Sequence, residues 1–113
     1  MLALARVNFA VIRPHMDDRV REYRTALEAA MSRLQPHITT GTIVGSDMSQ
    51  FLYVDRNERG VEIYGNEDTG VILDPAVGEE LQGEIIYPSF ELALDAAVRW
   101  LDGCELNDLR PAV

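Results

Sequence analysis

Three apolar runs separated by polar turns dominate the middle of the chain. The runs cover residues 51–55, 61–65 and 71–74 and are rich in Val, Ile, Tyr and Phe. The connections between them, RNERG and NEDTG, contain the Asn, Asp and Gly residues that tolerate the positive φ angles of hairpin turns. This pattern predicts an antiparallel meander of three short strands.

Two further segments ahead of the meander have the composition of strands. Residues 4–13 alternate loosely between two sides, which predicts a mostly buried strand that Pro14 ends. Residues 38–44 are rich in Thr and Ile and are interrupted by Gly41, which predicts a strand with a bulge. Together with the meander they give a sheet of at least five strands.

A helical period separates these two segments. Between about residue 18 and residue 35, apolar side chains recur at steps of three and four, which predicts one buried helix face. Asp17 or Asp18 is the expected N-terminal cap, and Pro36 disfavours helical geometry at the preceding residue and ends the helix. The apolar stripe consists of Val20, Tyr23, Leu27, Ala30, Met31 and Leu34.

The segment after the meander predicts a loop, a short strand and a second helix. Residues 76–83 are acidic, have no clear period and are expected to form a long loop. Residues 84–87 predict a short strand, after which Ser89 caps a helix that Gly103 ends. The remaining tail, residues 104–113, contains apolar side chains that need a contact, either on its own domain or on a neighbouring subunit.

The closing run YPSFELALDAAVRWLDG resembles the last strand and helix of many small bacterial α+β proteins, including some immunity proteins of toxin systems. The likeness covers about 17 residues. It consists of a cap followed by an amphipathic helix, so no functional residue is carried over from it.

These elements predict a single α+β domain over residues 1–113, with residues 104–113 as a C-terminal tail. The expected order is β-α-β-β-β-β-(β)-α. The antiparallel sheet should have about five to six strands, and both helices should pack on one of its faces.

The charge is strongly negative and unevenly distributed. The chain has 19 acidic and 10 basic residues, a net charge of −9. Residues 1–36 contain six arginines and four acids, whereas residues 37–113 contain four arginines and fifteen acids. Such a surface repels the nucleic-acid backbone, so we expect no nucleic-acid partner. The N-terminus lacks a signal-peptide pattern and a membrane span, and the single cysteine excludes an internal disulfide, which together predict a cytoplasmic protein.

Known catalytic and cofactor motifs are absent. The sequence has no glycine-rich phosphate loop, no nucleophile elbow and no calcium loop, so we expect no cofactor and no metal. His15, close to Asp17, is the candidate for proton transfer, while Cys104 has acidic neighbours that disfavour its thiolate. The acidic residues, including Glu62, are interpreted as parts of solvated turns.

The alternation of side chains along the strands predicts one sheet face that packs on the helices and a second face that binds a ligand or partner. If Phe51, Tyr53, Val61 and Ile63 face the helices, the other face is too apolar for water alone. We therefore expect a ligand or partner surface on that face, formed by Leu52, Val54, Tyr64 and Ile72. A pocket between the sheet and the helices would be lined by Tyr23, Met31, Phe51, Tyr53 and Trp100.

The leading hypothesis is a small non-enzymatic protein-interaction module, a homodimer with an acidic surface suited to a basic protein partner, at most immunity-like or cargo of a mobile element. One alternative is a protein that binds a small ligand in the aromatic pocket. Another is a small enzyme that uses His15 with a carboxylate.

Overall fold

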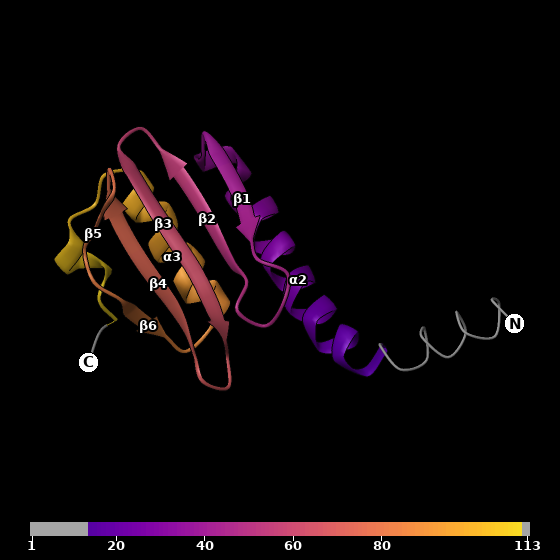
Figure 1. The fold of residues 1–113 in the computed structure, drawn as a ribbon. Helices are drawn as coiled ribbons and strands as arrows, with labels where there is room; N and C mark the ends of the chain where they lie inside the picture. Colours follow the sequence, from indigo (N-terminus) through magenta and orange to yellow (C-terminus); the bar gives the residue numbers. More distant parts are fainter. Residues whose placement is uncertain (1–13, 112–113) are drawn as a thin grey trace, which may run out of the picture.

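The computed structural model describes residues 14–111 of the protein (Figure 1). The strand expected over residues 4–13 and the side chain of His15 lie outside the described residues. No helix within residues 14–111 combines the length and the apolar character needed to cross a membrane. The elements follow in the order α2 (Pro14–Leu34), a 3-10 turn η1 (Gln35–His37), β1 (Thr40–Val44), β2 (Phe51–Arg56), β3 (Arg59–Asn66), β4 (Gly70–Val77), β5 (Glu80–Leu81), β6 (Ile85–Tyr87), α3 (Phe90–Leu101) and η2 (Leu106–Leu109).

The strands form one antiparallel sheet, which confirms the α+β class and the meander. The strand order is β1-β2-β3-β4-β5, and β6 pairs with β4 beside β5. The connection between β2 and β3 is shorter than the sequence indicated, because Arg56 already pairs with Arg59 and only Asn57 and Glu58 remain in the turn. Asn57 has a φ of 58°, a left-handed conformation that asparagine tolerates.

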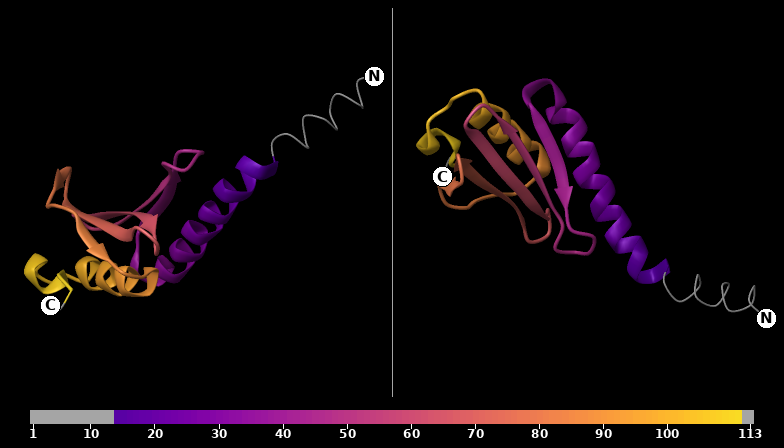
Figure 2. Two further views of the ribbon diagram at one scale, coloured as in Figure 1. Left: turned by 90° about the horizontal axis from the view of Figure 1, so that it is seen from below. Right: turned by 45° about the horizontal axis from the view of Figure 1, so that its top comes forward.

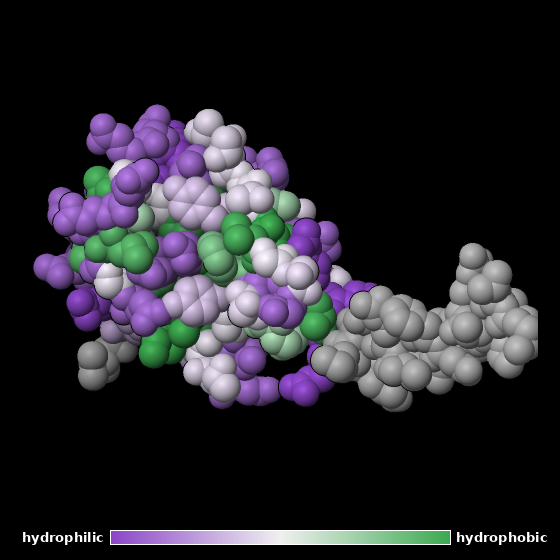
Figure 3. Space-filling model, in the orientation of Figure 1, coloured by the Kyte–Doolittle hydropathy of each residue, from purple (hydrophilic) through white to green (hydrophobic). Residues whose placement is uncertain are grey.

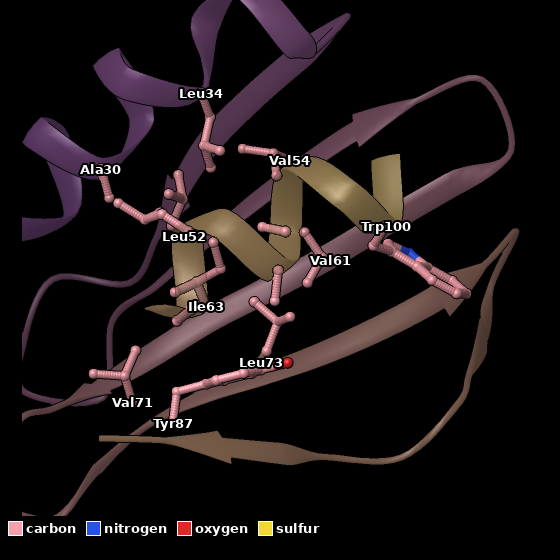
Figure 4. Close-up of a cluster of buried hydrophobic side chains, with 14 of the residues drawn as sticks. Ala30, Leu34, Leu52, Val54, Val61, Ile63, Val71, Leu73, Tyr87 and Trp100 are labelled. Carbon is pink, nitrogen blue, oxygen red and sulfur yellow. The ribbon is translucent and has the colours of Figure 1, made fainter. Parts of the chain in front are cut away.

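Both helices lie on the same side of the sheet, and the sheet curves away from them at both ends (Figure 2, left). Helix α2 runs beside β1 and β2, while α3 lies under β3 and β4. The core fills the space between these two layers (Figure 4). Its completely buried side chains come from α2 (Leu27, Leu34), from the sheet (Leu52, Val54, Val61, Ile63, Val71, Leu73) and from α3 (Ala93, Ala96, Ala97).

Trp100 fixes α3 to the hairpin of β2 and β3. Its indole nitrogen donates to the carbonyl of Gly60 at 2.9 Å, which satisfies a polar atom that is otherwise buried. The guanidinium of Arg59 lies over the indole ring, 4.0 Å from its centroid, and donates to the carbonyl of Trp100 at 3.0 Å. The N-terminal cap predicted for α3 is confirmed, since the Ser89 hydroxyl accepts from the amide of Leu92 at 3.2 Å.

Two local predictions from the sequence were wrong. Helix α2 already includes Pro14, because proline is compatible with the first turn of a helix, so Asp18 lies inside the helix rather than at its cap. Gly41 forms no bulge, because β1 pairs with β2 in unbroken register and Gly41 lies opposite Val54. A Cβ atom at Gly41 would lie 3.0 Å from the Ile38 side chain, so glycine serves close packing there.

The acidic segment after the meander is also more ordered than predicted. Strand β4 continues to Val77, and β5 folds back on it through a turn at Gly78, which has a φ of 61°. Beyond α3, Leu109 is completely buried, and the Tyr87 hydroxyl donates to its carbonyl. The tail up to this residue therefore packs on its own domain.

Candidate functional site

The sheet face on the side away from the helices is here called the outer face. No other segment of residues 14–111 lies over it (Figures 1 and 2). Figure 3 views the molecule from this side and shows hydrophobic groups interspersed with hydrophilic ones over the sheet. The face assignment predicted for β2 was wrong. Leu52 pairs with Ile63 and Val54 pairs with Val61, and all four are completely buried toward the helices.

Phe51 and Tyr53 consequently belong to the outer face, together with Tyr64 and Ile72. Directly paired residues lie on the same side of an antiparallel sheet, so the register defines rows across this face. One row is Thr42, Tyr53, Glu62 and Asp74, which pair in succession across β1, β2, β3 and β4. A neighbouring row consists of Tyr64, Ile72 and Ile86.

Asp74 is the most unusual residue of the outer face. Only 8% of its surface is exposed, and its Oδ1 atom has no hydrogen-bond partner within the described part of the chain. Burial, and secondarily the charge of Glu84, raises the pKa of the Asp74 carboxyl above its usual value. The buried Oδ1 therefore has neither water nor a donor to stabilise a negative charge, so the site disfavours the charged form of the carboxyl.

Glu62 and Glu84 add two more acidic groups beside Asp74. Glu62 lies in β3 directly opposite Asp74, so the interpretation of Glu62 as part of a turn was wrong. Burial and the charge of Asp74 raise the pKa of Glu62. Glu84 precedes β6 and accepts a hydrogen bond from the Tyr64 hydroxyl. Burial and this bond raise the pKa of Tyr64, which keeps the phenol in its neutral, donating form.

We call Tyr53, Glu62, Tyr64, Asp74 and Glu84 the acid–tyrosine cluster. No arginine pairs with it among the residues that the structure describes, since the four salt bridges found there join other residues. Within the same residues, no three His, Cys, Asp or Glu side chains are arranged to hold a metal ion. Within residues 14–111, the cluster is therefore a group of three carboxyls that no basic side chain neutralises.

The five predicted pocket residues do not converge on one cavity. Phe51 and Tyr53 lie on the outer face. Trp100 is buried in the core, and Met31 packs against the core from its edge. Of these five residues, only Tyr23 lines the cavity of about 440 Å³ that lies beside α2. This cavity lies between the first half of α2, the loop between β1 and β2, the turn between β3 and β4, and the start of α3.

Gln50 in the wall of this cavity carries a second unpartnered polar atom. It is 1% exposed, and its Oε1 accepts from Arg24 at 3.2 Å. Because a guanidinium can only donate, this bond fixes the amide orientation and leaves Nε2 as the buried donor without a partner. Tyr23 fastens the same region, since its hydroxyl donates to the Gln50 carbonyl at 2.7 Å and accepts from the amide of Gly65 at 3.1 Å.

Sequence reasoning named Tyr64 and Ile72 as surface residues of the site but named neither Asp74 nor Glu62. The available signal was two acids in strands that pair with each other, which is unfavourable unless something binds between them. Reading that signal requires the register of β3 and β4. Comparison with known proteins adds no further assignment, because no family model, no curated protein and no solved structure matches this chain.

Proposed function

We propose that this protein is a non-enzymatic interaction module whose outer face binds a cationic segment of a protein partner. The observation that carries the proposal is Asp74, a carboxyl that is more than nine-tenths buried and has an oxygen without a donor. A positively charged side chain would supply the missing donor and offset the charge of Glu62 and Glu84.

The surroundings of the cluster favour a polypeptide partner. Ile72 and Ile86 lie next to it, and Ile86 is 60% exposed, so apolar contact area adjoins the charged site. Tyr53 and Tyr64 combine large contact area with a hydroxyl, which is typical of residues at the centre of protein interfaces. The net charge of −9 would attract a basic segment over longer distances.

The proposal is tested by adding a basic peptide to isotope-labelled protein and following the amide signals by NMR. We expect saturable shifts at Glu62, Tyr64 and Asp74 that weaken as salt is raised. Asp74→Asn should remove most of the binding, whereas Glu67→Gln, which removes the same charge from an exposed turn, should leave it nearly intact. Absence of saturable binding, or shifts confined to the helices, would contradict the proposal.

The second part of the proposal is that the protein forms a homodimer, and that two copies pair through their edge strands β1. The sequence of β1, TGTIV, has no charge and no proline, and four of its five residues are exposed. Edge strands that stay unpaired usually contain a charged residue or a proline, which prevents pairing with another chain, and β1 has neither. A dimer through the outer face is disfavoured, because it would bring two acid–tyrosine clusters together.

Light scattering over a range of protein concentrations tests the β1 dimer. A two-fold antiparallel pairing centred on Thr42 would place the two copies of this side chain next to each other, so Thr42→Asp should shift the protein to the monomer. A wild type that is monomeric at every concentration refutes self-association and leaves the proposal for the outer face unaffected.

Binding of a small ligand is the second candidate function, and the buried Nε2 of Gln50 favours it. The cavity is lined by this side chain and the guanidinium of Arg19, and also by the carboxyls of Glu22 and Asp68, so a small carboxylic acid that also carries a cationic group is the ligand class that fits. A thermal-shift screen of small carboxylic acids checks this. A hit that survives Gln50→Leu would show that binding occurs elsewhere.

A further inference from the structure

The acid–tyrosine cluster has features that distinguish between the two kinds of basic side chain. We propose that it binds an arginine side chain of the partner in preference to lysine. This inference rests on the proposed function and adds the chemical identity of the recognised group. It depends on three features of the cluster: the pairing of two carboxyls, the burial of one of them, and the two tyrosine rings.

Glu62 and Asp74 present two acceptor groups side by side. They are paired directly across β3 and β4, and such opposite residues have Cβ atoms about 4.5–5.5 Å apart. A guanidinium has five N–H donors in one rigid plane, so it can donate to both carboxyls at once. An ammonium group is a point charge whose donors diverge, so it would satisfy one carboxyl well and the other poorly.

The burial of Asp74 sets a second condition. Because only 8% of this residue is exposed, a cation that reaches it must lose most of its own water on that side. Guanidinium is more weakly hydrated than ammonium, so its transfer into this position costs less.

Two tyrosine rings border the carboxyl pair. Tyr53 is directly opposite Glu62 on the neighbouring strand, and Tyr64 follows Glu62 by two residues on the same side of β3. The Tyr64 hydroxyl is already committed to Glu84, which holds the ring over this part of the face. Aromatic rings stack on the guanidinium plane, and the chain already contains one such pair in Arg59 and Trp100.

Instead of a cationic side chain, a proton shared between Glu62 and Asp74 could also reduce the repulsion of the two carboxyls. Burial raises the pKa of the Glu62 and Asp74 carboxyls, so each of them takes up a proton more readily than an exposed carboxyl does. A shared proton would not discriminate between arginine and lysine, so the experiment separates the two occupants.

The test compares three peptides that differ only in one repeated residue, (Gly-Ser-Xaa)₄ with Xaa as arginine, lysine or citrulline. Binding to the full-length protein is measured by calorimetry at pH 7.5 and low salt. We expect the arginine peptide to bind at least about tenfold more tightly than the lysine peptide, because the rigid guanidinium plane can donate well to both carboxyls at once. Citrulline, which has nearly the same shape without charge, should not bind measurably.

Matched variants show whether the preference arises in the cluster. Asp74→Asn should reduce the ratio of the two affinities to about one, while Glu67→Gln, with the same net charge, should keep the ratio of the wild type. Equal binding of arginine and lysine by the wild type overturns this inference and leaves the proposed function standing. Absence of binding by both peptides overturns the two together and leaves a proton as the occupant.

Discussion

Replacing Asp74 by asparagine should make this protein more stable at neutral pH, which is the opposite of the usual effect of a substitution at a buried position. Asparagine has nearly the same size and keeps a polar Oδ1, so the change removes little besides the charge. That charge has no neutralising partner among residues 14–111, and it lies opposite Glu62 in the neighbouring strand. Removal therefore relieves both the burial of a carboxylate and a like-charge repulsion.

The size of the effect follows from the pairing of Asp74 with Glu62. Two unit charges about 5 Å apart interact by about 1 kcal/mol in water and by about 3 kcal/mol at the effective dielectric constant of a protein surface. Burial of Asp74 acts in the same direction. We therefore expect Asp74→Asn to raise the free energy of unfolding by about 1–3 kcal/mol at pH 7.5, and the melting temperature by about 4 °C for each kcal/mol.

The pH dependence of the gain identifies its cause. The pKa of Asp74 in the folded protein is raised above its ordinary value of 3.8. The folded state therefore holds this proton to higher pH than the unfolded state does, so the stability of the wild type falls as pH rises through the folded pKa. Below pH 3.8 both states are protonated, and the difference between wild type and variant should vanish.

Urea denaturation of wild type, Asp74→Asn and Glu67→Gln at pH 4 and pH 7.5 measures this difference. The exposed Glu67 is the control, and its substitution should change stability by less than about 0.5 kcal/mol at either pH. A destabilised Asp74→Asn variant would refute the reasoning, because it would mean that the charge of Asp74 has a stabilising partner. A gain of equal size at both pH values would refute it as well, because the gain would then not arise from the charge.

Two further predictions test the fold that holds the cluster in place. Leu52→Ala should lower the free energy of unfolding by about 2–5 kcal/mol, whereas Ile72→Ala should lower it by less than about 1.5 kcal/mol. The difference arises because only Leu52 is fully buried. Equal losses of the two variants in urea denaturation would overturn the assignment of faces. Trp100→Phe should cost about 1–3 kcal/mol, because it leaves the Gly60 carbonyl without the indole donor and weakens the stacking of Arg59 on a smaller ring. Thermal unfolding that matches the wild type would show that neither contact contributes.

The sequence predicts the meander, both described helices and the cap at Ser89, because each depends on neighbours along the chain. The two faces of the sheet depend on register instead. A connection of two residues between β2 and β3 pairs Leu52 with Ile63, whereas the expected grouping of Tyr53 with Val61 and Ile63 requires a shift by one residue. Such a shift moves every side chain of a strand to the other face. That is why Leu52 and Val54 were expected in the wrong layer.

The same dependence on register explains why the acid–tyrosine cluster is invisible in the linear sequence. Glu62, Asp74 and Glu84 are separated by 12 and 10 residues, and only the pairing of β3, β4 and β6 brings them to one place. Three carboxyls gathered there without a cation from residues 14–111 reduce stability, and the change from acid to amide at Asp74 removes part of this penalty. If Asp74→Asn is both more stable and unable to bind an arginine peptide, the strain at Asp74 belongs to binding and not to folding. If the variant is more stable and binding is unchanged, the cluster is a tolerated defect, and the partner must be sought at the Gln50 cavity or at the β1 edge.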